Sequence, residues 1–220
     1  MTIDLALLRL LQLSSAALPA GSFAYSQGME WAVEARWVTD SDSTGDWLSG
    51  QMTTTMRHVD VPLLARLYEA DPDTAGDLDQ IVFACRETAE LRAEEHHRGQ
   101  ALLRVLRTLL PDAVNGCANR PRTSFVAAFA LAARCWNIPR DDALAGYLWS
   151  WLENQVLAAI RLAPIGQISG QRLLVSLSED IPAVIAAGVA CADADIGTSA
   201  PGIAIASCAH ESQYTRLFRS

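Results

Sequence analysis

The chain has 220 residues, half of them hydrophobic, which is enough to bury one sizeable core. Its 25 acidic residues outnumber its 17 basic residues, and the net charge of −8 argues against binding to a nucleic-acid backbone. All of the basic residues are arginine, so no lysine is present for a P-loop or a Schiff base, which excludes Walker-type nucleotidases and pyridoxal-phosphate enzymes.

Apolar residues recur at helical spacing almost throughout the chain, beginning with a short helix that Thr2 can cap. In chain order, we expect helices over about residues 3–13, 22–36, 44–57, 61–70, 77–110, 123–136, 141–162, 167–191 and from 203 toward the end. Gly99 is a possible break in the fifth of these helices. The 111–121 segment, which carries Asn115 and Gly116, and the small-residue segment 192–202 are expected to be loops.

No segment shows the alternating apolar pattern of strands bounded by hairpin turns. The expected fold is therefore all-α, a single-domain bundle of about eight to ten helices over residues 1–220. The 141–162 helix is apolar on most of its circumference and is expected at the centre of the core. The 111–121 loop is too short to argue for two domains.

The five cysteines are scattered, at Cys85, Cys117, Cys135, Cys191 and Cys208, and no two of them form a C-x-x-C motif. This pattern predicts neither a disulfide framework nor a zinc site, and it is typical of a reducing compartment. The sequence shows no signal peptide and no uncharged apolar run of the roughly 18 residues that a membrane span needs. We therefore expect a cytoplasmic protein with no membrane partner and no nucleic-acid partner.

The segment Ala24-Tyr25-Ser26-Gln27-Gly28 differs by one residue from the G-x-S-x-G elbow of serine hydrolases. That elbow follows a strand, whereas the preceding 18–24 segment is short and contains a proline and a glycine. A serine hydrolase that uses Ser26 with a late histidine such as His210 is an alternative function. The pattern favours the start of a helix, in which the small Ser26 and Gly28 would allow another chain to approach closely.

An acidic face is expected on the helix of the middle region, where Glu90, Glu94 and His97 fall at positions i, i+4 and i+7. Two carboxylates and one imidazole are ligands that nickel or zinc would accept. Ligands from a single helix are weaker evidence than ligands that converge from two elements, and solvated acidic faces are common. The sequence therefore favours no metal site and no cofactor.

The chain is rich in tryptophan, and the six residues are Trp31, Trp37, Trp47, Trp136, Trp149 and Trp151. Such residues are more often core or interface anchors than the lining of a pocket. A helical small-molecule-binding regulatory domain nevertheless stays open as an alternative function. Trp149 and Trp151 lie about 200° apart around a helix, so we expect them to face opposite sides.

The C-terminal segment, at about residues 203–220, is unusual because it ends with aromatic, leucine and arginine side chains. Chain ends are normally polar and frayed. The interleaving of Tyr214, Leu217 and Phe218 with two arginines is instead the composition of protein-interface hot spots. We therefore expect a partner-binding tail, unless Leu217 and Phe218 are buried within the domain.

Four blocks of the sequence resemble the urease accessory protein F (UreF) family. The segment LLQLSSAALPAGSFAYSQGMEWAVE is similar to the family's N-terminal block, and Glu90-Leu91-Arg92 followed by Gly99 is similar to its middle block. Residues 147–171, which include Tyr147-Leu148-Trp149, Glu153-Asn154 and Pro164-Ile165-Gly166-Gln167, resemble a later block. Residues 210–220 resemble the family's C-terminus. The blocks occur in the family's order and span nearly the whole chain.

This resemblance implies an all-α homodimer that has no catalytic centre of its own. Family members bridge the urease accessory protein D/H and the GTPase UreG on apo-urease, and they couple GTP hydrolysis to nickel delivery. The resemblance implies that Arg216 recruits the GTPase. The expected partner-binding residues are Tyr25, Ser26, Gln27, Glu30, His210, Glu211, Tyr214, Arg216, Leu217 and Phe218.

Overall fold

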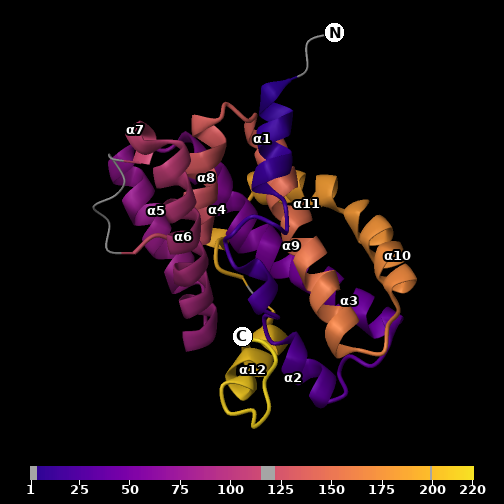
Figure 1. Ribbon diagram of the computed structural model, residues 1–220. Helices are drawn as coiled ribbons and strands as arrows, with labels where there is room; N and C mark the ends of the chain where they lie inside the picture. The colour runs from indigo at the N-terminus through magenta and orange to yellow at the C-terminus, as the bar shows by residue number, and fades with distance from the viewer. Residues whose placement is uncertain (1–3, 115–121, 199) are drawn as a thin grey trace.

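The computed structural model describes residues 4–114, 122–198 and 200–220 (Figure 1). These residues form helices joined by turns and loops, with no strand among them, which confirms the all-α class. The expected Thr2 cap and the Asn115-Gly116 pair lie outside the described residues. Residues 111–114, which we expected to be loop, form one short helix.

The helices follow one another as α1 (Leu5–Leu13), η1 (Ser22–Ala24), α2 (Met29–Glu34), α3 (Ser41–Gln51), η2 (Met52–Asp60), α4 (Val61–Glu69), α5 (Pro72–Ala84), α6 (Ala89–Leu109), α7 (Pro111–Val114), α8 (Phe125–Cys135), α9 (Arg140–Leu162), α10 (Gln167–Ser178), α11 (Ile181–Val189), η3 (Asp193–Asp195) and α12 (Pro201–His210). Within the described ranges, no helix has the length and apolar character needed to cross a membrane.

Helix α9 lies at the centre of the molecule, as the sequence predicts (Figure 1). Its inward-facing Leu144, Leu148 and Leu152 are fully buried, because the helix is apolar on most of its circumference. Two phenylalanines of α8, Phe125 and Phe129, pack against Tyr147 of α9 with ring centroids 5.9 and 5.2 Å apart. These aromatic contacts between α8 and α9 therefore form part of the main core.

The expected helix over residues 22–36 is wrong, because the chain turns twice within it. The 3₁₀ turn η1 is followed by extended Tyr25, and then Gln27 and Gly28 adopt left-handed backbone angles, with φ of 53° and 82°. Helix α2 begins only at Met29. A Cβ atom on Gly28 would lie 3.0 Å from the backbone nitrogen of Ser207, so the close approach that Gly28 allows is that of α12 in the same chain.

Residues 41–69 form one nearly continuous helical run, whereas the sequence suggested two helices separated near residue 60. Helix α3 begins at Ser41, earlier than expected, and is capped by Asp40, whose pKa is lowered by hydrogen bonds from Ser43. The middle of the run, η2, is a π-helix, and its wider turns place Asp60 in the protein interior. Pro62 is accommodated because it lies in the first turn of α4.

The break in the expected 77–110 helix falls at residues 85–88 and not at Gly99. Thr88 ends the break by capping α6, since its hydroxyl accepts a hydrogen bond of 3.1 Å from the Leu91 amide. Gly99 lies within α6, at the place where the chain leading into α8 crosses it. The expected 167–191 helix is likewise divided, into α10 and α11, and the proline in the first turn of α11 marks the division.

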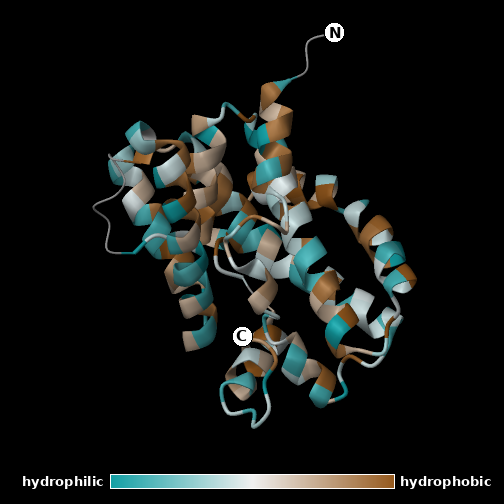
Figure 2. Cartoon of the chain, viewed as in Figure 1, coloured by the Kyte–Doolittle hydropathy of each residue, from teal (hydrophilic) through white to brown (hydrophobic). Residues whose placement is uncertain are grey.

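Helices α1 and α10 each present several apolar side chains to the outside, and Figure 2 shows brown segments along both of them. On α1 these are leucines, among them Leu5 and Leu11, and on α10 they are Ile168 and Val175. The expectation for the tryptophan pair holds, because Trp151 is buried and Trp149 is 39% exposed.

Two glycines provide a test of this packing. A Cβ atom at Gly99 would lie 2.1 Å from the carbonyl oxygen of Thr123, whereas a Cβ atom at Gly50 in α3 would meet nothing within 4 Å. We expect Gly99→Ala to lower the free energy of unfolding by about 1–3 kcal/mol, because backbone must move. Gly50→Ala should raise it by about 0.5–1 kcal/mol, because alanine is the better helix former. Urea unfolding measures both, and equal effects would contradict the assigned crossing.

Candidate partner-binding site at the C-terminal tail

Residues 211–220, called the C-terminal tail below, fold back against α2, α6 and the segment before α2. The tail follows α12, which packs beside α2 at the lower end of the view in Figure 1. Two backbone hydrogen bonds hold its last residues: Arg219 donates to the Ala24 oxygen at 2.9 Å, and Ser26 donates to the Ser220 oxygen at 2.8 Å. The N-terminal block and the C-terminal tail therefore form one site.

The carboxylate of Glu30 fixes the backbone of the tail. It accepts a hydrogen bond from the Leu217 amide at 2.6 Å and another from the Phe218 amide at 2.9 Å. Glu30 is 8% exposed, and it lies in the first turn of α2, where the helix dipole favours a negative charge. Hydrogen bonds to a buried carboxylate are among the stronger ones in proteins, so this contact orders the tail.

His210, the last residue of α12, is fully buried between two carboxylates. Its Nε2 lies 3.1 Å from Oε2 of Glu30, and its Nδ1 lies 2.7 Å from Oε2 of Glu90. A carboxylate oxygen is an acceptor, so both contacts are hydrogen bonds only when both ring nitrogens carry a proton. His210 therefore bridges the carboxylates of Glu30 and Glu90.

Arg216 joins the same network from the tail. Its guanidinium forms an ion pair with Glu90, and it also donates to the Arg219 carbonyl oxygen at 3.0 Å. Arg216 thus braces the final turn of the tail against α6. Because its side chain is 31% exposed, it remains accessible from outside.

Glu94, one turn after Glu90 on α6, holds the end of the tail. Its carboxylate accepts from the Ser220 hydroxyl, from Arg98 and from Gln27, each at 2.9 Å. The side-chain oxygen of Gln27 in turn accepts from the indole nitrogen of Trp151 at 2.9 Å. Gln27 therefore links the tail site to α9.

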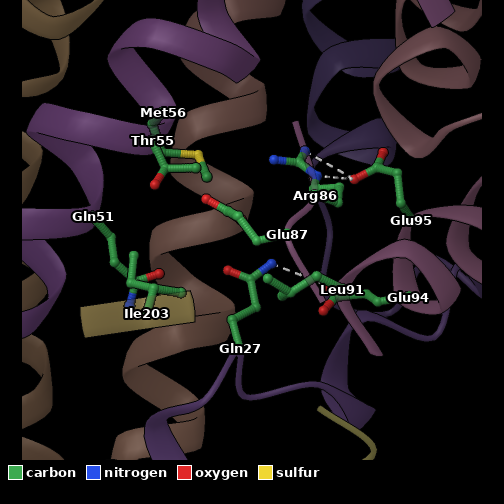
Figure 3. A pocket seen from close by; sticks show the side chains of 10 residues that line it. All are labelled: Gln27, Gln51, Thr55, Met56, Arg86, Glu87, Leu91, Glu94, Glu95 and Ile203. Carbon is green, nitrogen blue, oxygen red and sulfur yellow. Dashed lines mark hydrogen bonds and ion pairs between the residues drawn. The ribbon is translucent and has the colours of Figure 1, made fainter. Parts of the chain in front are cut away.

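Figure 3 shows Gln27 directed toward Glu94 at one side of a small internal cavity. The cavity has a volume of about 30 Å³, which matches one or two water molecules. Its wall also includes Arg86 and Glu95, and the dashed lines in Figure 3 mark the ion pair between them. This size excludes the cavity as a site for an organic ligand.

A second buried ionic cluster lies beyond this cavity. Arg86 donates to both carboxylate oxygens of Asp60, at 2.8 and 3.0 Å, and to Glu95 at 3.0 Å. Burial alone would lower the pKa of Arg86, but the two carboxylates outweigh it and raise that pKa well above its usual value. The Tyr147 hydroxyl donates to Asp60 at 2.6 Å, and burial raises the pKa of Tyr147 well above its ordinary range. The charged side chains of the cluster are all buried, and their mutual compensation serves the fold.

The structure does not support Ser26 as a nucleophile. Ser26 is fully buried, and its hydroxyl donates to the Ser220 carbonyl oxygen at 2.6 Å. The same oxygen of Ser26 accepts from the Glu30 amide at 3.3 Å. No sheet exists in the described part of the chain to carry an elbow. Ser26 is instead a backbone anchor for the tail.

The metal interpretation of Glu90, Glu94 and His97 finds no support either. The two carboxylates are occupied by His210 and by the arginines and amide described above, whereas His97 is exposed. No group of three or more residues in the described ranges is arranged to hold a metal ion.

The structure divides the expected binding residues into buried anchors and displayed side chains. Tyr214 is fully exposed, Leu217 is 66% exposed, and Glu211 is also exposed. Phe218, expected as a surface anchor, is 5% exposed and packs inward. The remaining expected residues lie in or beside the hydrogen-bond network: Tyr25, Ser26, Gln27, Glu30, His210 and Arg216.

Sequence reasoning missed that Glu90 and Glu94 hold the tail. The four-residue spacing between Glu94 and Arg98 is an ion-pair signal that is visible in the sequence, and it favours mutual compensation over metal binding. Nothing in the local sequence indicated Ser220 as a partner, because its contacts reach across 126 and 194 residues.

Comparison with known proteins places this all-helical chain among accessory proteins of an enzyme. A sequence model of the UreF family matches residues 38–178. A "Urease accessory protein UreF" of Alkalilimnicola ehrlichii is 47% identical over 217 residues, which cover 96% of this chain and 95% of that protein. Proteins of the same name from Pseudomonas putida and Marinomonas sp. are 46% and 43% identical, and each covers 100% of this chain. The chain therefore belongs to the UreF family of urease accessory proteins.

Replacement of Glu30 tests the anchoring of the tail. Glu30→Gln keeps the shape but removes the charge that the Leu217 and Phe218 amides face, so we expect their hydrogen exchange to become about tenfold faster or more. Glu34→Gln, one turn later on α2, is the matched control because Glu34 is exposed and contacts only the Gln213 side chain of the tail. Equal exchange in both variants would contradict the role of Glu30.

Replacement of Arg86 tests the second cluster. Arg86→Met leaves Asp60 and Glu95 buried without their cation, so we expect a loss of about 3–5 kcal/mol in the free energy of unfolding. Arg140→Met removes an exposed ion pair with Glu69 and should cost about 1 kcal/mol or less. Urea unfolding of the two variants checks the difference, and a small effect at Arg86 would contradict the assigned charge compensation.

Proposed function

We propose that this protein is a scaffold for nickel insertion. It bridges the urease accessory protein D/H and the GTPase UreG, and it couples GTP hydrolysis to nickel delivery into apo-urease. Membership of the UreF family supports the accessory role. The single observation that supports the bridging role is the C-terminal tail, whose backbone is held by buried Glu30 while Tyr214 and Leu217 are displayed.

In this proposal the tail is a suitable recognition surface because its contacts with Glu30 would set its conformation before a partner arrives. A partner that binds a preformed segment does not have to order it, and the entropic cost of association is correspondingly smaller. A fully exposed tyrosine and a largely exposed leucine beside Arg216 have the composition of interface hot spots. In this proposal Arg216 acts in two ways, by bracing the tail and by contacting the GTPase.

The chain itself lacks the means for nucleotide chemistry. It contains no lysine for a P-loop, so hydrolysis would belong to the GTPase partner. In the proposed assembly the chain is a cytoplasmic homodimer without an enzymatic activity of its own. Light scattering of the purified chain measures the oligomeric state directly.

The displayed side chains can be tested without disturbing the fold. We expect the double variant Tyr214→Ala/Leu217→Ala to bind the D/H protein or UreG with an affinity about tenfold lower or more. Its thermal unfolding should be unchanged, because both side chains are exposed. Leu109→Ala is the matched control, since Leu109 is 46% exposed and lies at the opposite end of α6 from the tail.

Co-purification and urease activation in cells that carry the partner proteins provide the measurement. Unchanged complexes and normal urease activation in the double variant would contradict the tail as the recognition surface. A loss in Leu109→Ala as large as in the double variant would contradict it as well.

A further inference from the structure

A second concave site lies on the far side of Tyr25 from the buried network. It is an open cleft of about 680 Å³ between α6, the segment around residues 19–25 and the end of the tail. Its polar side chains are Tyr25, His96, His97, Gln100, Arg104 and Arg219. We call this the basic cleft. Its volume falls within the range of about 300–1,000 Å³ that is usual for small-molecule sites.

The charge of the basic cleft is opposite to that of the protein. The chain carries a net charge of −8, yet the residues that line this cleft include two arginines and two histidines and no carboxylate. None of the ion pairs among the described residues involves Arg104 or Arg219. The nearby carboxylate of Glu94 is already paired with Arg98 at 2.9 Å. The two guanidinium groups therefore remain uncompensated at one concave surface.

The cationic groups of the cleft are held in place by the fold. The backbone of Arg219 is fixed by its hydrogen bond to the Ala24 oxygen at 2.9 Å, and its guanidinium interacts with the Tyr25 hydroxyl. The Tyr25 hydroxyl also lies 3.5 Å from Nδ1 of His97. Arg104 projects from α6, two turns beyond His97, so its origin is fixed by a regular helix.

His96 adds two observations that point to a missing negative charge. Its Nδ1 atom is buried and has no hydrogen-bond partner within the described part of the chain. Its pKa is lowered by burial and then by the positive charges of Arg122 and His97. Unsatisfied buried nitrogen atoms are uncommon in native proteins. An anion in the cleft would act against the part of this shift that comes from Arg122 and His97.

We propose that the basic cleft binds a small oxyanion of the phosphate class. Guanidinium groups bind phosphate through paired, charge-assisted hydrogen bonds, and the Gln100 amide adds a neutral donor at the same surface. The acidic remainder of the chain disfavours a long polyanion, whereas the residues that line this cleft include no carboxylate. The phosphate group has two possible sources, free inorganic phosphate or a nucleotide, for which exposed Phe23 offers a ring to stack on. This inference does not depend on the proposed scaffold function.

The experiment is a titration of the full chain with inorganic phosphate and, separately, with AMP, at constant ionic strength held with chloride. Binding is followed by the NMR signals of His96 and His97 and by calorimetry. We expect saturable binding that Arg104→Gln weakens about fivefold or more, because one charge-assisted contact is lost. Arg107→Gln is the matched control, since Arg107 is exposed on the same helix and does not line the cleft. It should change the affinity by less than about twofold.

The ligand should also shift the titration of His96 to higher pH, which a purely structural role of Arg104 would not produce. Tighter binding of AMP than of phosphate would identify a nucleotide as the source, and equal binding would identify the phosphate group alone. The proposal is overturned if neither ligand gives saturable binding, or if Arg107→Gln weakens binding as much as Arg104→Gln does.

Discussion

The buried carboxylate of Glu30 is the contact on which the C-terminal part of the structure depends. It receives two amides of the tail and faces His210, so a single side chain joins α2, α12 and the tail. A buried charge is tolerated only where hydrogen bonds and an opposite charge compensate it, and all of its compensation comes from distant segments. The tail is therefore not an appendage to a finished fold but part of what makes the burial of Glu30 possible.

Helix α6 connects the tail site to the rest of the protein. Glu90 and Glu94 face the tail, Glu95 faces Arg86 in the second ionic cluster, and the bare backbone at Gly99 admits the chain that leads into α8. The basic cleft begins on the same helix at His96, directly after Glu95. A displacement of α6 would therefore alter the tail site, the second ionic cluster, the crossing at Gly99 and the basic cleft, because tightly packed elements transmit strain to their neighbours.

Helical periodicity was sufficient to predict the all-α class and the central α9, since both depend on apolar spacing within one segment. The composition marked the tail as unusual. The resemblance to the UreF family assigned residues of both terminal blocks to partner binding. The π-helical turns around Asp60 and the turn at Gly28 could not be predicted, because they depend on which distant segment packs there. The role of Glu90 could not be predicted for the same reason, because its partners His210 and Arg216 lie 120 and 126 residues away.

The long reach of these contacts has a consequence for synthesis of the chain. The partners of the Glu30 carboxylate lie 180, 187 and 188 residues further along, so none of them exists until residues 210–218 have been translated. Contacts of such high sequence separation form late, because a long loop must be closed before they contribute. During translation, α2 would therefore lack the partners of its Glu30 carboxylate while the helices between α2 and the tail assemble. Completion of the site would require residues 210–218 to have been synthesised.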